Sequence, residues 1–190
     1  MKKSKFRTLA TLIAVACSSA ASLAQIPEGY YDSLKGKKGA DLKSAVHDII
    51  KDAKVLSYGS GNGKTWWGFW ITDRTSDGRF IDRYSKEGTW PMSTSQGAVG
   101  AGMNIEHSFP KSWWGKTENQ AYKDLYNLMP CESGINSKKS NYPMGEVVSG
   151  NIGNGWTKVG DGNDGKKYWE PADEWKGDFA RGYMYMATCY

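Results

Sequence analysis

Apolar residues recur at helical spacing between residues 39 and 54. Leu42, Val46 and Ile49 follow one another at intervals of three or four residues, so they share one face of a helix. The spacing predicts a helix over residues 39–54. His47 lies beside the apolar stripe, which is typical of a surface or boundary histidine on a helix.

A glycine-rich segment, residues 59–65, precedes an aromatic run at residues 65–72. The aromatic run is β-prone, so we expect a glycine turn that leads into a buried strand. A turn at residues 77–78 and a partner strand at residues 80–84 complete the expected hairpin. The glycine segment does not fit a phosphate-binding loop, because Tyr58 stands where that motif needs glycine and because no helix is expected after it.

A second hairpin is predicted between residues 156–159 and residues 166–169, with a polar loop at residues 161–165. The loop resembles a calcium-binding loop at first sight. Counting excludes that motif, because Lys166 and Ala172 stand where glycine and glutamate are needed.

The last part of the chain, residues 171–190, carries Trp175, Phe179 and Tyr183 at helical spacing and is predicted to be a helix. Residues 132–140 are polar, follow a proline, and are expected to form one or two helical turns. Helices that alternate with short antiparallel strands indicate a mixed α+β fold.

The first 24 residues are predicted to be a secretory signal rather than part of the fold. A basic start is followed by an apolar run at residues 9–17 and by small residues that end at Ala24, where we expect cleavage. Lipidation at Cys17 is a less favoured alternative. No other stretch is long and apolar enough to span a bilayer, so residues 25–190 are expected to form one exported domain, periplasmic or secreted.

Charge and cysteine content add little once the signal is set aside. Four of the 25 basic residues and none of the 20 acidic residues lie in residues 1–24, so the remainder carries a net charge of only +1. Net charge therefore does not indicate nucleic-acid binding, and any basic surface must be local.

Two cysteines, Cys131 and Cys189, remain after the signal is removed. The sequence leaves two possibilities open: a disulfide between them, or two buried free thiols.

The strongest chemical signal is Glu106 followed directly by His107, with Asn136 further along the chain. A carboxylate and a carboxamide oxygen suit a hard cation such as Mg²⁺, and a neutral imidazole suits a general base that activates water. This set points to metal-assisted hydrolysis of a phosphodiester. Neighbours on a regular strand point to opposite faces, so the two residues can share one site only at a strand end or an irregularity.

Four segments in order resemble the bacterial endonuclease I family: residues 104–115, 124–130, 136–147 and 169–181. That family comprises secreted or periplasmic nucleases of the ββα-metal (His-Me) finger class. The resemblance extends from about Ile26 to the end of the chain. It implies a catalytic motif of two strands and a helix that hold one Mg²⁺ ion, with Mn²⁺ as an alternative.

Carried over by position, the resemblance implies that His107 is the general base and that Glu106 and Asn136 are catalytic metal ligands. It also implies substrate contacts from four polar side chains: Lys111, Lys139, Asn141 and Arg181. Lys139 departs from the family, because arginine is usual there and lysine lacks the bidentate fork that grips a phosphate. The chain also lacks the further helical segment that family members carry, so we expect a C-terminally short member.

These expectations define a monomeric, Mg²⁺-dependent, non-specific endonuclease that cleaves DNA and leaves 5′-phosphates, with RNA left open as a substrate. The alternative is an exported nucleic-acid-binding relative whose catalysis is weakened or lost, which Lys139 and the short C-terminus motivate. An aromatic-rich carbohydrate-binding module is a third, weaker alternative. Trp113 and Trp114 are interpreted as core residues, with stacking on nucleic-acid bases as the second interpretation.

Overall fold

The computed structural model describes residues 26–86, 89–92 and 95–190. The predicted signal segment, with Cys17, lies outside the described residues. Contacts divide the chain into two units, residues 1–35 and residues 36–190. In the first unit, the described residues form turns and a short 3-10 helix, η1 (Asp32–Leu34).

None of the helices in the described part of the chain is long and apolar enough to cross a bilayer.

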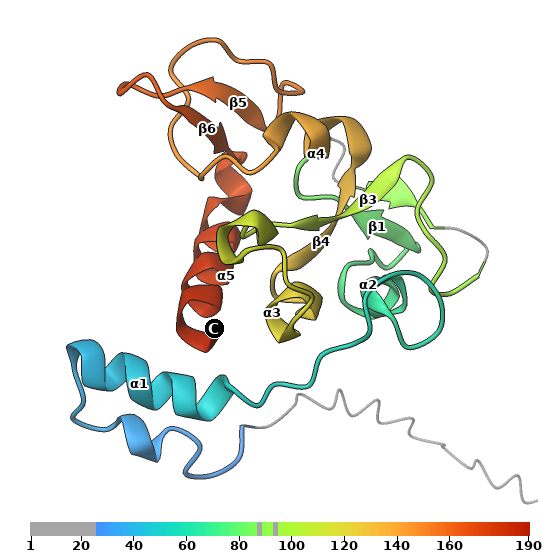
Figure 1. Cartoon of the computed structure of the whole chain (residues 1–190). Coiled ribbons are helices and arrows are strands. Elements are labelled where there is room, and N and C mark those ends of the chain that lie inside the picture. Colours follow the sequence, from blue (N-terminus) through green and yellow to red (C-terminus); the bar gives the residue numbers. More distant parts are fainter. Residues whose placement is uncertain (1–25, 87–88, 93–94) are drawn as a thin grey trace, which may run out of the picture. The chain divides into compact units, whose positions relative to one another are not determined.

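The second unit combines five α-helices with three separate pairs of antiparallel strands (Figure 1). This arrangement confirms the mixed α+β class. The elements are α1 (Gly39–Ile50), α2 (Thr65–Thr72), β1 (Arg79–Ile81), β2 (Thr89–Pro91), β3 (Met103–His107), η2 (Lys111–Trp114), α3 (Gln120–Lys123), β4 (Leu128–Glu132), α4 (Ser133–Lys139), β5 (Lys158–Asp161), β6 (Lys167–Glu170), η3 (Asp173–Trp175) and α5 (Lys176–Cys189).

The pair of β3 and β4 separates two hydrophobic clusters. In this pair Glu106 lies opposite Met129, and His107 lies opposite Leu128. Met129 packs in a cluster with Ile135 of α4 and residues of β5, β6 and α5. Leu128 packs in the other cluster, with residues of α2 and β1. Side chains directly opposite each other share a face, so Glu106 faces the first cluster and His107 the second.

Helix α4 follows β4 without a loop and lies against the β3–β4 pair (Figure 1). Its start is capped by Glu132, whose carboxylate accepts hydrogen bonds from the backbone N–H groups of Gly134 and Ile135. Ile135 is buried and anchors the helix on the first cluster. The expected short helix after Pro130 is confirmed, and β3, β4 and α4 together give two strands and a helix.

The prediction of a strand at residues 65–72 is wrong, because this segment forms the helix α2. Trp66 and Phe69, three residues apart, are both buried in the second cluster. The segment is apolar on almost every side, and such a run has no period that could separate a buried helix from a buried strand. The preceding glycine segment therefore does lead into a helix, although the residue count still excludes a phosphate-binding loop.

Strand β1 covers only part of the segment expected at residues 80–84, and its partner is β2 rather than residues 65–72. The second predicted hairpin is confirmed as the pair β5–β6. The terminal helices are also confirmed, with small changes of boundary: α1 ends at Ile50, and α5 begins at Lys176 after the 3-10 turn η3. His47 joins these helices through a contact of 2.9 Å between its Nδ1 and the carbonyl oxygen of Thr188.

The disulfide between Cys131 and Cys189 is not formed, because both residues are free, buried thiols. Cys131 lies in the middle of β4 inside the first cluster. The Cys189 thiol lies instead near the end of α5, 3.5 Å from the carbonyl oxygen of Ile50 in α1.

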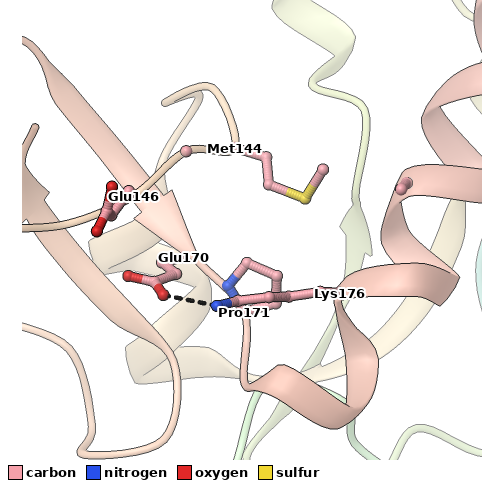
Figure 2. A pocket seen from close by; sticks show the side chains of 7 residues that line it. Met144, Glu146, Glu170, Pro171 and Lys176 are labelled. Atoms are coloured by element: carbon pink, nitrogen blue, oxygen red, sulfur yellow. Dashed lines mark hydrogen bonds and ion pairs between the residues drawn. The ribbon is translucent and has the colours of Figure 1, made fainter.

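Glu170, at the end of β6, ties the β5–β6 hairpin to the start of α5. Its carboxylate accepts hydrogen bonds from Lys158, from Lys176 and from the backbone N–H of Val147. Burial opposes ionisation of this carboxyl, but the hydrogen bonds outweigh that effect and lower its pKa to about 2. Figure 2 shows Glu170 and Lys176 facing each other in a pocket that Glu146 also lines.

Because the pKa of Glu170 lies below its ordinary value of 4.5, its ionised form stabilises the fold above pH 4.5. We expect this contribution to be lost as the pH falls from 4.5 toward 2. After allowance for solvent around the half-exposed lysines, it amounts to about 1–2 kcal/mol. Urea unfolding at a series of pH values measures it. Glu170→Gln should flatten this part of the pH dependence, whereas Glu146→Gln, which changes an exposed carboxylate, should leave it as in the wild type.

Candidate active site

His107 ends strand β3, and its ring is buried. Its Nε2 atom lies 3.0 Å from the carbonyl oxygen of Tyr122. A carbonyl can only accept a hydrogen bond, so Nε2 carries the proton and Nδ1 keeps its lone pair. Burial lowers the pKa of His107 to about 4, and the Tyr122 carbonyl only partly opposes this shift. The histidine is therefore neutral at pH 7 and able to accept a proton.

Aromatic side chains fix the orientation of the His107 ring. Tyr58 stacks on it with ring centres 5.7 Å apart and planes at 21°, and the Tyr122 ring packs at 4.5 Å. Trp114 of η2 approaches edge-on at 6.3 Å. Together with the hydrogen bond to the Tyr122 carbonyl, these contacts restrict rotation of the imidazole.

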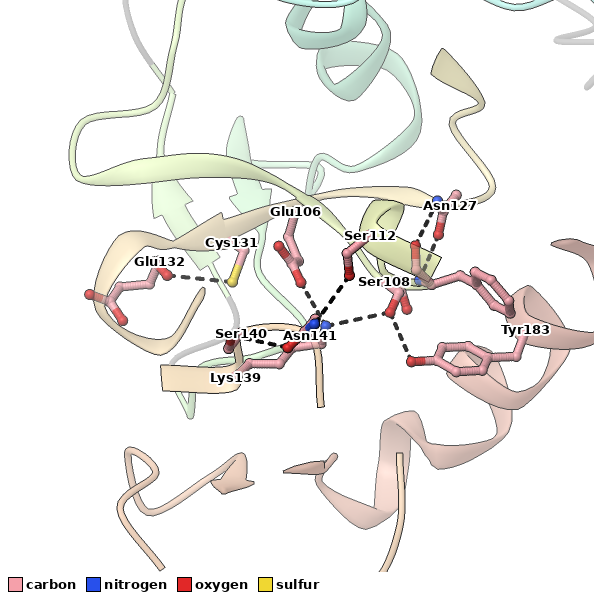
Figure 3. A network of polar contacts seen from close by, with 11 residues as sticks. Glu106, Ser108, Ser112, Asn127, Cys131, Glu132, Lys139, Ser140, Asn141 and Tyr183 are labelled. Carbon is pink, nitrogen blue, oxygen red and sulfur yellow. Dashed lines mark hydrogen bonds and ion pairs between the residues drawn. The ribbon is translucent and has the colours of Figure 1, made fainter. Parts of the chain in front are cut away.

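Glu106 is buried on the opposite face of β3, where it forms an ion pair with Lys139 of α4. The Lys139 Nζ atom lies 2.7 Å from Oε1 of Glu106 and 3.4 Å from the carbonyl oxygen of Ser108 (Figure 3). The same ammonium lies 4.9 Å from the ring centre of Trp169. Burial raises the pKa of the Glu106 carboxyl, and the charge of Lys139 opposes that rise.

Lys139 was expected to contact a substrate phosphate, and in the structure its ammonium is paired with Glu106. Its side chain is 0% exposed and is held by Glu106. A lysine buried in this way can reach a phosphate only if the ion pair breaks. Lys139 instead neutralises the carboxylate that the sequence singled out as a metal ligand.

Glu106 and His107 leave a regular strand on opposite faces, as the alternation of side chains requires. His107 is the last residue of the strand, however, and both groups are within the electrostatic influence of the same two lysines, Lys111 and Lys139. The carboxylate and the imidazole therefore lie on opposite faces at the strand end, and the charges of Lys111 and Lys139 act on both.

Asn136 lies on the side of α4 that faces β3. It precedes Lys139 by three residues, and residues at this spacing share one face of a helix. Because Lys139 reaches Glu106, Asn136 is placed one turn earlier on the same side, and its side chain is half-buried. No direct contact joins Asn136 to Glu106 in the described part of the chain.

A metal ion would find only a small set of ligands here. Among the described residues, no three side chains of His, Cys, Asp or Glu gather closely enough to hold one. One carboxylate and one carboxamide nevertheless fit Mg²⁺, which takes few oxygen ligands from the protein and completes its shell with water and substrate phosphate. The donor chemistry is compatible with a divalent ion that shares the Glu106 carboxylate with Lys139.

The other three predicted substrate residues differ in their surroundings. Lys111 lies near His107, with its Nζ atom 3.4 Å from the hydroxyl of Tyr122 and 5.1 Å from that ring's centre. Asn141 donates a hydrogen bond to the hydroxyl of Ser112, which links the end of α4 to η2 (Figure 3). Arg181 forms an exposed ion pair with Asp178 on α5.

Asn127 holds the segment that leaves β3. Its side chain accepts a hydrogen bond from the N–H of Phe109 and donates one to the carbonyl oxygen of the same residue. Its own carbonyl accepts from the N–H of Ser108, and the hydroxyl of Tyr183 donates to the carbonyl of Ser108. The backbone after His107 is therefore fixed from two directions.

Sequence reasoning did not identify three of these residues as parts of the site: Tyr58, Tyr122 and Asn127. Tyr58 was noted only because it breaks a glycine motif, and Tyr122 acts through a backbone carbonyl that no side-chain pattern reveals. Asn127 acts by bonding to the backbone of Phe109, a contact that no spacing in the sequence indicates.

The profile of the Endonuclease I family matches residues 38–190. An extracellular ribonuclease of Bacillus amyloliquefaciens is 35% identical over 167 residues, which cover 86% of this chain and 54% of that protein. An extracellular ribonuclease of Bacillus subtilis (strain 168) is 32% identical over 166 residues, covering 85% and 53%. The chain spans about half the length of these curated relatives.

No solved structure matches the chain significantly. The sequence profile covers most of the chain, including the three strand pairs and the helices α4 and α5. Both curated relatives are above 30% identity over more than four fifths of this chain. The chain therefore belongs to the Endonuclease I family.

Proposed function

We propose that this protein is a metal-dependent endonuclease that hydrolyses phosphodiester bonds without sequence preference. The observation that carries the proposal is the neutral His107, fixed by the Tyr122 carbonyl beside the buried carboxylate of Glu106. Family membership supports the same reaction. The strands β3 and β4 with helix α4 would then be the ββα-metal motif that the sequence predicts.

His107 supplies the general base. Its Nδ1 atom accepts a proton from water while Nε2 remains bonded to Tyr122, so the ring does not need to turn during the reaction. The water oxygen then attacks phosphorus, and the bond to the leaving oxygen breaks. Breaking the bond between phosphorus and the 3′ oxygen, which takes up a proton from solvent to become a 3′-hydroxyl, leaves the 5′-phosphate that the resemblance implies.

Lys111 is the best placed of the predicted substrate residues to hold the phosphate. It lies close enough to both Glu106 and His107 to influence their ionisation. It forms no ion pair with an acidic side chain among the residues that the structure describes. An unpaired ammonium beside the base attracts the phosphate and favours the charge that develops in the transition state.

Glu106 and Asn136 would hold the divalent ion, which supplies positive charge to the phosphate and the leaving oxygen when bound. Lys139 keeps the Glu106 carboxylate in one orientation and neutralises it inside the protein. Because the Lys139 ammonium lies against only one oxygen of the Glu106 carboxylate, the other oxygen would be able to bind the metal ion.

The relatives are named extracellular ribonucleases, which supports RNA as a substrate beside the DNA expected from the sequence. The same names support export, in agreement with the predicted signal at residues 1–24. Contacts to the sugar–phosphate backbone would serve both nucleic acids, because they do not read base identity.

Replacing His107 with alanine removes the base, and we expect cleavage of a plasmid or a single-stranded RNA in Mg²⁺ to fall about 10²- to 10⁴-fold. His47→Ala is the matched control, since it changes the only other histidine in the chain, which contacts the carbonyl of Thr188 in α5. Chelation of the metal should abolish wild-type cleavage, and added Mg²⁺ or Mn²⁺ should restore it. Full activity of His107→Ala would overturn the assignment.

The alternative, a relative that binds nucleic acid without cleaving it, predicts a different result in the same assay. It predicts salt-sensitive retention of the nucleic acid by the wild-type protein with no product at any concentration of Mg²⁺ or Mn²⁺. Metal-dependent product from the wild-type protein would exclude it.

Lys139→Met leaves the Glu106 carboxylate buried without its partner, so we expect a loss of about 3–5 kcal/mol in the free energy of unfolding. Lys138→Met is the control, because Lys138 is exposed and donates only to the carbonyl of Gly153. Glu106→Gln combined with Lys139→Met should recover most of the lost stability. If Lys139→Met instead kept its stability and lost only affinity for nucleic acid, the phosphate-binding role expected from the sequence would be correct.

A further inference from the structure

Trp113 stands in an unusual position for a tryptophan. It belongs to the short helix η2, directly after the strand end that carries His107, and its side chain is 43% exposed. Tryptophan is highly buried on average, so a large exposed indole beside a catalytic site needs an explanation. The inference drawn from it rests on the proposed nuclease function.

The indole is held firmly although it is exposed. The rings of Phe109 and Tyr183 pack against it at 4.9 and 6.2 Å, with interplanar angles of 76° and 85°. Phe109 is itself fixed by the two hydrogen bonds between its backbone and Asn127. A flat apolar surface that is already immobilised loses little conformational entropy when a ligand binds.

The residues on either side of Trp113 connect it to the site. The next residue, Trp114, approaches the His107 ring at 6.3 Å, and the preceding residue, Ser112, accepts a hydrogen bond from Asn141, which follows the end of α4. Lys111 opens the same helix and influences both His107 and Glu106. One turn of chain therefore presents the exposed indole next to the groups that would handle the phosphate.

The charge around Trp113 is complementary to a nucleic-acid backbone. Lys111 lies two residues before it and Lys116 three residues after it, and Lys116 is exposed. Neither lysine forms an ion pair within residues 26–86, 89–92 and 95–190. Unpaired cations interleaved with an exposed aromatic ring are the features with which proteins bind single strands, where the cations follow the phosphates and the ring stacks on a base.

We propose that Trp113 is a stacking platform for one unpaired base of a nucleotide that flanks the phosphate held at His107. A base inside a duplex is already stacked on both sides and would have to be flipped out, with loss of its stacking and pairing. The preferred substrate is therefore a single strand of RNA or DNA. Stacking uses the π-face that every base has, so it adds strand preference without sequence preference.

The first test measures binding separately from cleavage. The His107→Ala protein, without metal, is titrated into fluorescein-labelled single strands and duplexes of the same sequence, and anisotropy reports the dissociation constants. Adding Trp113→Ala should weaken single-strand binding about 5- to 100-fold and change duplex binding much less. Trp113→Phe should recover most of the affinity. Tyr126→Ala, which removes an aromatic ring that is 70% exposed and packs on Tyr185, should leave the ratio of the two affinities unchanged.

The second test locates the stacked base. Abasic linkers placed one at a time along the single strand should reveal one position at which the loss of the base weakens binding to the Trp113-containing protein. At that position Trp113→Ala should cause no further loss, because the two changes remove the same contact. Equal losses with Trp113→Ala on single strands, duplexes and every abasic strand would overturn the stacking proposal.

The two proposals fail separately in these measurements. If the wild-type protein cleaves in Mg²⁺ and Trp113→Ala binds single strands with wild-type affinity, the stacking proposal is rejected and the nuclease assignment stands. If the wild-type protein never cleaves, but its binding to single strands depends on Trp113 and on one base, only the nuclease assignment is rejected.

Discussion

Alternation of side chains across the β3–β4 pair is the constraint on which the rest of the structure depends. Residues opposite each other in this pair share a face, so one face receives Met129 and Glu106 and the other receives Leu128 and His107. Each face carries its own hydrophobic cluster, and the two clusters stabilise the pair from both sides. A one-residue slip of either strand would exchange the faces and expose both clusters.

The same constraint explains why the two chemical groups differ in their surroundings. Glu106 enters the cluster that α4 covers, where a buried charge needs a partner, and Lys139 provides it at 2.7 Å. His107 enters the aromatic side, where burial favours the neutral ring. A carboxylate paired with a lysine and an imidazole held in its neutral form thus arise from adjacent residues, because the strand sends them into different environments.

Much of the fold could be predicted from the local spacing of apolar residues, and the elements that were predicted wrongly have physical explanations. The helices α1 and α5 and the β5–β6 hairpin have one apolar face or a clear turn, so their spacing identified them. Helix α2 was missed because its residues are apolar on nearly all sides. The ion pair between Lys139 and Glu106 was not foreseen, because sequence does not reveal that α4 turns this side chain inward. The aromatic support of His107 comes from Tyr58 and Tyr122, which no spacing rule connects to it.

The two hydrogen bonds between Asn127 and Phe109 involve only main-chain atoms of Phe109. They therefore do not depend on the identity of the side chains in η2, which follows. We therefore expect that substitution of the exposed Trp113 changes the surface beside the site while the backbone that carries His107 stays in place. When the backbone is fixed independently of the exposed side chains, those side chains can be exchanged without loss of the site's geometry. Under the stacking proposal, changes at Trp113 would alter the nucleic-acid preference of this protein without disturbing the framework, so η2 is the natural target for engineering.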